Sequence, residues 1–271
     1  MDENDPDSQE RKQTAEVIER ARGQESILYL ENRSPTGACQ ARNDGAAAST
    51  GEFLAFLDDD DFWREDKVTR QVELFRSAPS DTGLVYTGLQ IVDTQENVIK
   101  YRKPNYRGCI LNELLAENVI NTLSSVMVPR KIFEEVGGFD PAFPSRQDLD
   151  LYIRIAERYR IDFVPGPLTC YTNLYNESIS KNYVKKLKGR ALILSKYQYL
   201  YAKRRKIQAR YHYGTAKLSL KHGDDLGVLQ WLAESLKAYP TVKALVRYLS
   251  TLLLHPHAAL KKDLHKENKI S

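Results

Sequence analysis

Residues 51–61 read GEFLAFLDDDD, a short apolar run that ends in a row of aspartates. Its apolar part, residues 53–57, has the length of one strand and lies between a glutamate that follows Gly51 and a row of carboxylates. A short continuous apolar run of this kind indicates a strand buried on both faces of a helix-flanked sheet. Four aspartates, Asp58 to Asp61, follow at its carboxyl end. In such sheets the functional site lies beyond the carboxyl ends of the strands.

On both sides of this stretch, helical and strand patterns alternate along the chain. Helices are expected at residues 15–21, 37–49, 68–75, 111–117 and 147–159, with a short one from Lys131. Strands are expected at residues 26–30, 53–57, 84–92, 98–101, 122–128, 161–164 and 168–171. Strands that alternate with helices predict an α/β fold with a mostly parallel sheet flanked by helices.

From about Lys181 the strand signals stop, and the chain changes its charge. Residues 1–180 carry 20 Lys and Arg against 31 Asp and Glu, whereas residues 181–271 carry 20 against five. Helical patterns cover residues 192–201, 209–221, 226–239 and 242–254. We therefore predict two domains, an α/β domain at residues 1–180 and a basic helical extension at residues 181–271.

The three cysteines, Cys39, Cys109 and Cys170, are odd in number and lack metal-ligand spacing. This argues against a disulfide framework or a zinc site and favours a reducing, cytoplasmic location. No apolar run reaches the roughly 18 residues that a membrane-spanning helix needs, and the polar N-terminus does not resemble a signal peptide. The sequence therefore predicts a chain that is cytoplasmic or at most peripheral at the cytoplasmic face of the membrane.

Four adjacent carboxylates repel one another unless water or a cation neutralises them. Oxygen-only ligands favour Mg²⁺ or Mn²⁺, and Mg²⁺ is usually held by one or two carboxylates plus substrate phosphates. A second interpretation is a solvated acidic turn in which Asp61 caps the next helix. A calcium EF-hand is excluded, because no register gives Gly at the sixth and Glu at the twelfth position.

Four motifs in the same order and spacing resemble family 2 glycosyltransferases with the GT-A fold. They are GACQARNDG at residues 37–45, GEFLAFLDDDDFW at 51–63, GGFD at 137–140 and QDLDLYIR at 147–154. The resemblance extends over residues 2 to about 180. It implies inverting transfer of a sugar from a nucleotide-diphosphate donor to an acceptor hydroxyl.

The resemblance also implies a role for each matching residue at the donor side. Asp58 and Asp60 match the family's DxD positions, which hold a divalent metal, Mn²⁺ or Mg²⁺, and through it the donor diphosphate. Asp59 is expected to face the donor. Arg42 and Asn43 match the Ala-Arg-Asn motif that lines the donor site and supports the diphosphate; from the residues alone they equally fit an exposed arginine and a helix-terminal asparagine.

Asp148 matches the family's general base, where members usually read Glu-Asp and this chain reads Gln147-Asp148. The base takes the proton of the acceptor hydroxyl on the face of the sugar opposite the leaving group. Spacing alone leaves a second interpretation open, because a carboxylate at a helix start also stabilises the helix. Asp150, two positions on, cannot share that helical face and is expected to have a structural or acceptor-side role.

The front of the chain departs from the family pattern. Members begin with a strand, a helix and a second strand whose terminal acidic residues contact the nucleotide. This sequence opens at MDEND, roughly where the second strand should end. We expect about 30–40 residues of that strand-helix-strand unit to be absent, through a misplaced start codon or a genuine loss. Asp2 then matches a nucleotide-contacting aspartate.

Three functions compete. The first is a metal-dependent glycosyltransferase of hexosyltransferase type that uses a nucleotide-sugar donor and a glycan, polysaccharide or lipid-linked acceptor. The second is a catalytically inactive, truncated relative that serves as a binding or scaffold protein. A nucleotidyltransferase shares the metal and nucleotide chemistry but gives no reason for the Gln147-Asp148 helix.

The basic extension suggests one further partner. The run KRRK at residues 203–206 and the amphipathic stretch at 242–254 favour peripheral contact with anionic lipid head groups. A solvated basic face is the plainer alternative. No nucleic-acid partner is expected, because no DNA- or RNA-reading motif accompanies the charge.

Overall fold

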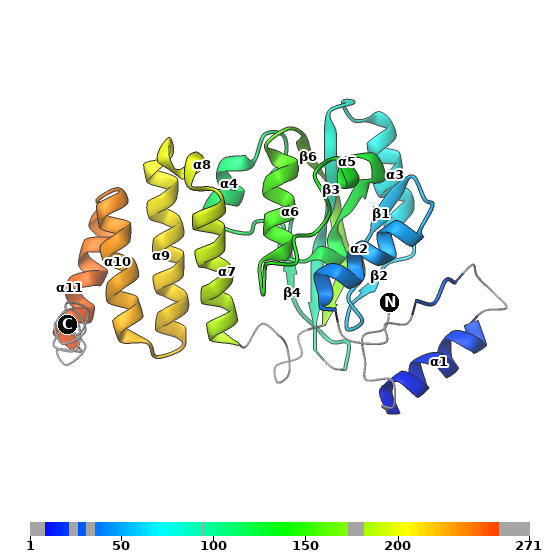
Figure 1. Cartoon of the computed structure of the whole chain (residues 1–271), viewed down its shortest axis with the longest axis horizontal. Helices are drawn as coiled ribbons and strands as arrows, with labels where there is room; N and C mark the ends of the chain where they lie inside the picture. The colour runs from blue at the N-terminus through cyan, green and yellow to red at the C-terminus, as the bar shows by residue number, and fades with distance from the viewer. Residues whose placement is uncertain (1–8, 22–26, 31–35, 94, 173–181, 255–271) are drawn as a thin grey trace. The chain divides into compact units, whose positions relative to one another are not determined.

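The computed structural model describes residues 9–21, 27–30, 36–93, 95–172 and 182–254 of the 271-residue chain (Figure 1). These residues divide into two compact units, one within Met1–Gly108 and Thr122–Tyr175 and the other within Cys109–Asn121 and Asn176–Ser271. The second unit therefore combines the C-terminal part of the chain with a short segment, Cys109–Asn121, that lies between the two parts of the first unit in the sequence. The prediction of separate domains at residues 1–180 and 181–271 stays a prediction.

The first unit is an α/β unit built on one sheet. Its helices are α1 (Gln9–Ala21), α2 (Ala38–Ala48), α3 (Lys67–Ser77), α5 (Arg130–Glu135) and α6 (Gln147–Ala156), with a 3-10 turn η1 (Leu123–Ser125). Its strands are β1 (Phe53–Ala55), β2 (Phe62–Trp63), β3 (Thr82–Val92), β4 (Val98–Arg102), β5 (Met127–Pro129) and β6 (Arg160–Thr172). The predicted α/β class is confirmed.

The strand directions differ from the prediction. The order is β1-β5-β3-β6-β2, with β4 paired to β3. Among the described strands only β3 and β6 pair in parallel; the β1–β5, β5–β3, β3–β4 and β2–β6 pairs are antiparallel. β1, β3 and β6 nevertheless point the same way. The helix-strand alternation identified these three, whereas the shorter β2, β4 and β5 run back between or beside them and make the sheet mixed.

The long strand β6 replaces two strands that were expected at residues 161–164 and 168–171. Gly166, which lies between two prolines, adopts φ 108° and lets the chain bulge without leaving the sheet. Opposite it, a Cβ atom on Gly88 would come within 2.6 Å of the Gly166 carbonyl oxygen. Two glycines therefore allow β3 and β6 to stay paired across the bulge.

Helix α3 covers the central strands. Leu74 and Phe75 on this helix pack against a buried cluster of Val85, Val164 and Leu168. The first turn of this helix follows the acidic turn at residues 58–61 after the short strand β2. By contrast, the predicted strand at residues 26–30 is not formed: residues 27–30 adopt no regular structure, and Leu28 is 65% exposed. A strand needs a neighbour to satisfy its backbone groups, and no described strand pairs with this segment.

The second unit is helical throughout its described part. It contains α4 (Leu111–Ala116), α7 (Tyr183–Lys196), α8 (Gln198–Ala202), α9 (Arg205–Lys221), α10 (Asp225–Ala238) and α11 (Val242–Leu254). Helices α9, α10 and α11 pack in succession around a core of Ala216, Val228, Leu232 and Ala244 (Figure 1). The hydroxyl of Tyr201 donates to the Leu115 carbonyl and ties α8 to α4. No described helix has both the length and the hydropathy to cross a bilayer.

Candidate functional site

The four aspartates form a tight turn rather than a strand end. The Asp61 amide donates to the Asp58 carbonyl at 3.0 Å, and the turn joins β1 to β2. Within it, Asp59 is exposed, Asp58 and Asp60 are half-buried and Asp61 is only 8% exposed. The turn therefore directs the four carboxylates into different surroundings.

Asp61 anchors this turn to the sheet. One of its carboxylate oxygens accepts from the Thr172 amide at 3.1 Å, while the other is buried and has no hydrogen-bond partner. Burial raises the pKa of Asp61 to about 6, against the hydrogen bonds from Ser124 and Thr172 that lower it. Helix α3 begins after Asp66, so the interpretation of Asp61 as the cap of the next helix is wrong.

Ser124 supports the turn from below, and no sequence signal pointed to it. Its hydroxyl accepts from the Asp58 amide at 3.1 Å, and its carbonyl accepts from the Trp63 indole at 2.7 Å. Both contacts join residues more than 60 positions apart. The short turn η1 therefore contacts the first residue of the acidic turn and the strand β2 that follows it. Only a strand was expected at the residues of η1.

A buried lysine lies behind the turn. The Lys67 ammonium donates to the Gln71 side chain at 2.8 Å and lies 4.0 Å from the centroid of the Trp63 ring. Gln71 in turn donates to the carbonyls of Val85 and Ser125. Burial lowers the pKa of Lys67 to about 7. The ring face of Trp63 attracts the charged ammonium and so acts to raise the pKa of Lys67.

Arg42 on helix α2 reaches the acidic turn. Its guanidinium lies 2.7 Å from an Asp58 carboxylate oxygen, with side chains that are 26% and 33% exposed. The guanidinium also lies 5.8 Å from the centroid of the Phe139 ring. Two motifs 16 positions apart in the sequence are thus brought together.

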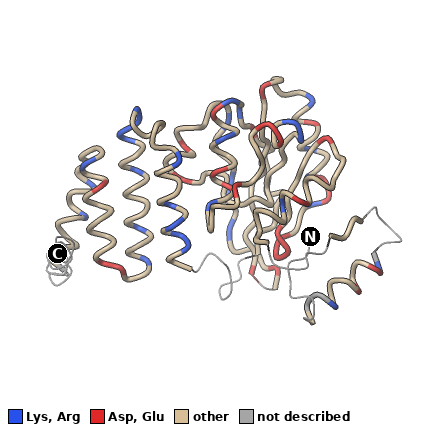
Figure 2. Tube along the Cα trace, viewed as in Figure 1, with Lys and Arg blue, Asp and Glu red and all other residues tan. Residues whose placement is uncertain are grey.

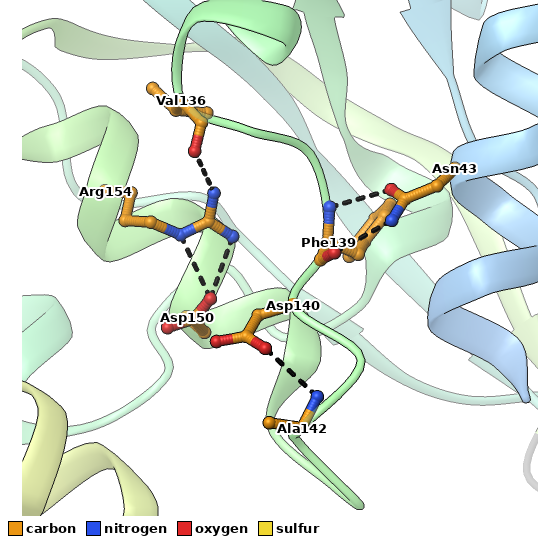
Figure 3. Close-up of polar contacts among 7 residues, drawn as sticks. All are labelled: Asn43, Val136, Phe139, Asp140, Ala142, Asp150 and Arg154. Atoms are coloured by element: carbon orange, nitrogen blue, oxygen red, sulfur yellow. Dashed lines mark hydrogen bonds and ion pairs between the residues drawn. The ribbon is translucent and has the colours of Figure 1, made fainter.

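Asn43, the next residue on α2, makes a different contact. Its amide nitrogen donates to the Phe139 carbonyl and its amide oxygen accepts from the Phe139 amide, both at 2.8 Å (Figure 3). The close approach depends on glycine, because a Cβ atom on Gly138 would come within 2.7 Å of the Asn43 side-chain oxygen. Asn43 therefore fixes the loop at residues 137–140 with both polar atoms of its amide.

That loop begins as a helix cap. The Gly138 amide donates to the Phe133 carbonyl at 2.9 Å and the Gly137 amide to the Glu134 carbonyl at 3.0 Å. Both glycines have positive φ angles, 83° and 64°, which only glycine adopts without strain. The double glycine thus ends α5 and delivers Phe139 to Asn43.

Helix α6 carries the two aspartates of the fourth motif, and their roles separate. Asp150 is fully buried, and one of its oxygens accepts two hydrogen bonds from Arg154, at 3.0 and 2.8 Å (Figure 3). Arg154 also donates to the Val136 carbonyl. Asp150 therefore holds Arg154, which ties α6 to the end of α5, and this agrees with the structural one of its two expected roles.

Asp148 lies four residues before Tyr152 on the same face of α6. Tyr152 is fully buried, and its hydroxyl has no hydrogen-bond partner. Burial raises the pKa of Tyr152 well above its usual range; the charges of Asp148 and Asp58 add to this effect, and that of Arg42 opposes it. The charged groups that act on this buried phenol thus belong to α2, the acidic turn and α6.

The carboxylates of the acidic turn fit a divalent metal only in part. In the described ranges, no three or more His, Cys, Asp or Glu side chains gather as a metal-binding group. Burial first, and then the charges of Asp58 and Asp59, raise the pKa of Asp60, so a cation there would offset unfavourable charge. These residues fit a metal held by one or two carboxylates together with substrate phosphates, and not an all-protein cage. Asp2 lies outside the described residues.

Comparison with known proteins decides the family. The family model described as glycosyltransferase like family 2 matches residues 6–222. The chain belongs to this glycosyltransferase family. Within the family, an uncharacterized glycosyltransferase of Rickettsia conorii is 32% identical over 135 residues, which are 47% of this chain and 21% of that protein. The chain spans 21%, 24% and 53% of the lengths of the first three curated relatives, which are therefore longer than this chain.

One relative carries a specific activity in its name. It is the Escherichia coli UDP-Glc:alpha-D-GlcNAc-diphosphoundecaprenol beta-1,3-glucosyltransferase WfgD, 28% identical over 60% of this chain and 61% of its own. Among solved structures, S. aureus TarS residues 1–349 matches with a TM-score of 0.59 at 15% identity, over 93% of this chain and 75% of that one. The Pyrobaculum calidifontis mannosyltransferase in complex with GDP-Man and Mn²⁺ matches with a TM-score of 0.53 at 15% identity, over 92% and 69%. These neighbours establish the predicted GT-A fold.

Proposed function

We propose that this chain is a metal-dependent, inverting glycosyltransferase of the hexosyltransferase type. It moves a sugar from a nucleotide-diphosphate donor to an acceptor hydroxyl. The observation that carries the proposal is the ion pair of 2.7 Å between Arg42 and Asp58, since it joins two of the four motifs that match the family.

In this proposal Asp58 and Asp60 hold Mn²⁺ or Mg²⁺, and the metal, when bound, offsets the charge that develops on the diphosphate leaving group. Arg42 gives up its ion pair with Asp58 and binds the diphosphate, for which a guanidinium is well suited. The exposed Asp59 faces the donor. Asn43 keeps the loop at residues 137–140 in place, and Asp2 contacts the nucleotide.

Asp148 accepts the proton of the acceptor hydroxyl as that oxygen attacks the sugar. A base at the start of α6 is separate from the metal ligands in the sequence and on a different element, as a one-step inversion requires. Gln147 beside it is uncharged, whereas members of the family usually carry a glutamate at this position.

The acceptor is a glycan, a polysaccharide or a lipid-linked saccharide. The activity in the name of WfgD, on a diphosphoundecaprenol-linked sugar, supports the last of these. All three cysteines are free, which supports a reducing, cytoplasmic location. Peripheral contact of the basic helices with a membrane completes the proposal, and no nucleic acid takes part.

The test is donor turnover. The full chain is incubated with Mn²⁺ and a panel of nucleotide sugars, and release of the nucleoside diphosphate is followed with and without chelator. We expect release with at least one donor, its loss on chelation, and a product of inverted anomeric configuration by NMR. Release of pyrophosphate would instead identify a nucleotidyltransferase, and absence of both binding and turnover would identify an inactive relative.

A further inference from the structure

Helix α11 has two faces of different kinds. On its inner face Ala244 and Tyr248 pack against the core of the helical unit, and Thr251 is buried. Its opposite face carries five apolar side chains that recur every three or four residues, which places them in one stripe. This outer stripe consists of Val242, Leu245, Val246, Leu249 and Leu253, which are 78%, 47%, 60%, 50% and 82% exposed.

Among the described residues α11 is the last helix of the stack, and an apolar outer stripe is unusual at such a position. Terminal helices of stacked arrays normally turn a polar face to solvent, because an apolar one has no neighbour to cover it. Contiguous apolar patches on a protein surface mark contact sites with a protein or a membrane. The outer stripe is therefore a candidate contact site, and the charge around it indicates the kind of binding partner.

The charge of the helical unit is strongly positive. Residues 182–254 contain 15 Lys and Arg but only three Asp and Glu, and helices α7, α9 and α11 contain no acidic residue (Figure 2). On α11 itself, Lys243 and Arg247 are exposed and lie to one side of the outer stripe. An apolar stripe bordered by basic residues has the composition of helices that lie in the interface of anionic membranes.

The dimensions agree with this occupant. A helix of 13 residues is about 20 Å long, too short to cross the roughly 30 Å hydrocarbon core, so it lies in the membrane plane. A second copy of the chain fits less well. Two stripes of about 20 Å by 10 Å bury far less than the roughly 800 Å² that each partner contributes to a stable interface. Such a pair would also bring like charges together.

We propose that the outer stripe of α11 docks on an anionic lipid surface. Its five apolar side chains enter the boundary between head groups and acyl chains, while Lys243 and Arg247 contact lipid phosphates. This assignment deepens the membrane contact in the proposed function. It is tested without a donor, so it holds or fails independently of sugar transfer.

The experiment is flotation of the full chain with vesicles of phosphatidylcholine alone or mixed with phosphatidylglycerol. We expect binding to the mixed vesicles that weakens with salt. Val246→Ser with Leu249→Ser should lower binding at least about tenfold, because two partly inserted side chains are lost. Lys243→Ser with Arg247→Ser should remove most of the dependence on phosphatidylglycerol. Val98→Ser with Ile99→Ser, on strand β4, removes two apolar residues of 43% and 48% exposure and should bind as the wild type does.

The variants alter exposed residues, and circular dichroism melting identifies any that fail to fold. Equal binding by the wild type and the Val246→Ser/Leu249→Ser variant would overturn the proposal, as would failure of the wild type to bind mixed vesicles. A dimer in light scattering that the same variant dissociates, without vesicle binding, would make a second copy the occupant and also overturn it.

Discussion

The guanidinium of Arg42 lies 2.7 Å from the carboxylate of Asp58 and joins helix α2 to the acidic turn. Both side chains are partly exposed, so water screens their attraction and the pair contributes at most about 1 kcal/mol to stability. A pair of this strength is readily exchanged for a stronger partner. A diphosphate offers Arg42 such a partner and leaves Asp58 free to bind a cation.

Arg42→Ala should therefore affect ligand binding much more than stability. We expect the midpoint of urea unfolding to change by the equivalent of less than about 1 kcal/mol, and the affinity for nucleoside diphosphates to fall about tenfold or more. Arg42→Lys, which keeps the charge but not the fork of donors, should recover only part of the affinity. Calorimetric titration measures it; unchanged affinity in Arg42→Ala would show that Arg42 serves only the ion pair.

Asn43→Ala should instead destabilise the fold. The substitution removes both hydrogen bonds to the Phe139 backbone and leaves the amide and carbonyl of this buried residue without these partners. We expect a loss of about 1–3 kcal/mol in the free energy of unfolding. Asn97→Ala, in the exposed turn between β3 and β4, is the matched control and should cost less. If the two variants unfold alike, the Asn43 contact does not hold the loop.

Two tyrosines offer a test of the buried phenol. The Tyr152 hydroxyl is buried without a partner, whereas the Tyr86 hydroxyl donates to the Tyr106 carbonyl at 2.9 Å. Tyr152→Phe should leave stability unchanged or raise it by about 1 kcal/mol, while Tyr86→Phe should lower it by a similar amount. Chemical denaturation of both variants compares them. A large loss in Tyr152→Phe would mean that its hydroxyl has a partner in solution.

Lys67 predicts a rise of stability with pH. Burial lowers its folded-state pKa from 10.5 to about 7. Between these values the unfolded state binds more protons than the folded state, so the free energy of unfolding increases with pH. The increase is up to about 2 kcal/mol between pH 7 and pH 9, and attraction of the ammonium by the Trp63 ring reduces it. The difference between wild type and Lys67→Met over this range measures it, and parallel pH curves would contradict it.

The elements that the sequence predicts are those that depend on patterns of neighbouring residues. The apolar run before Asp58 gave strand β1, the alternation around residues 84–101 gave the β3–β4 pair, and the helical periods gave α6 and α9 to α11. The family resemblance pointed to Arg42 and Asp148, and the structure shows Arg42 in an ion pair with Asp58. Their roles stay predictions.

What the sequence could not predict depends on contacts between distant residues. Ser124 supports the acidic turn through hydrogen bonds over more than 60 positions, and nothing near Ser124 marks it as different from other serines. The two amide contacts of Asn43 join residues 96 positions apart. The directions of β2 and β5 follow from their pairing, which two- or three-residue strands do not encode in any periodicity.

In the proposed reaction Asp148 accepts the acceptor proton while other residues hold the donor. The most direct measurement compares Asp148→Asn with the wild type for sugar transfer and, separately, for affinity towards the donor with Mn²⁺. We predict that transfer falls about 10²–10⁴-fold while donor affinity stays within about twofold. Asp150→Asn, which breaks the contact to Arg154, should lower stability instead. Wild-type transfer by a folded Asp148→Asn protein would contradict the account.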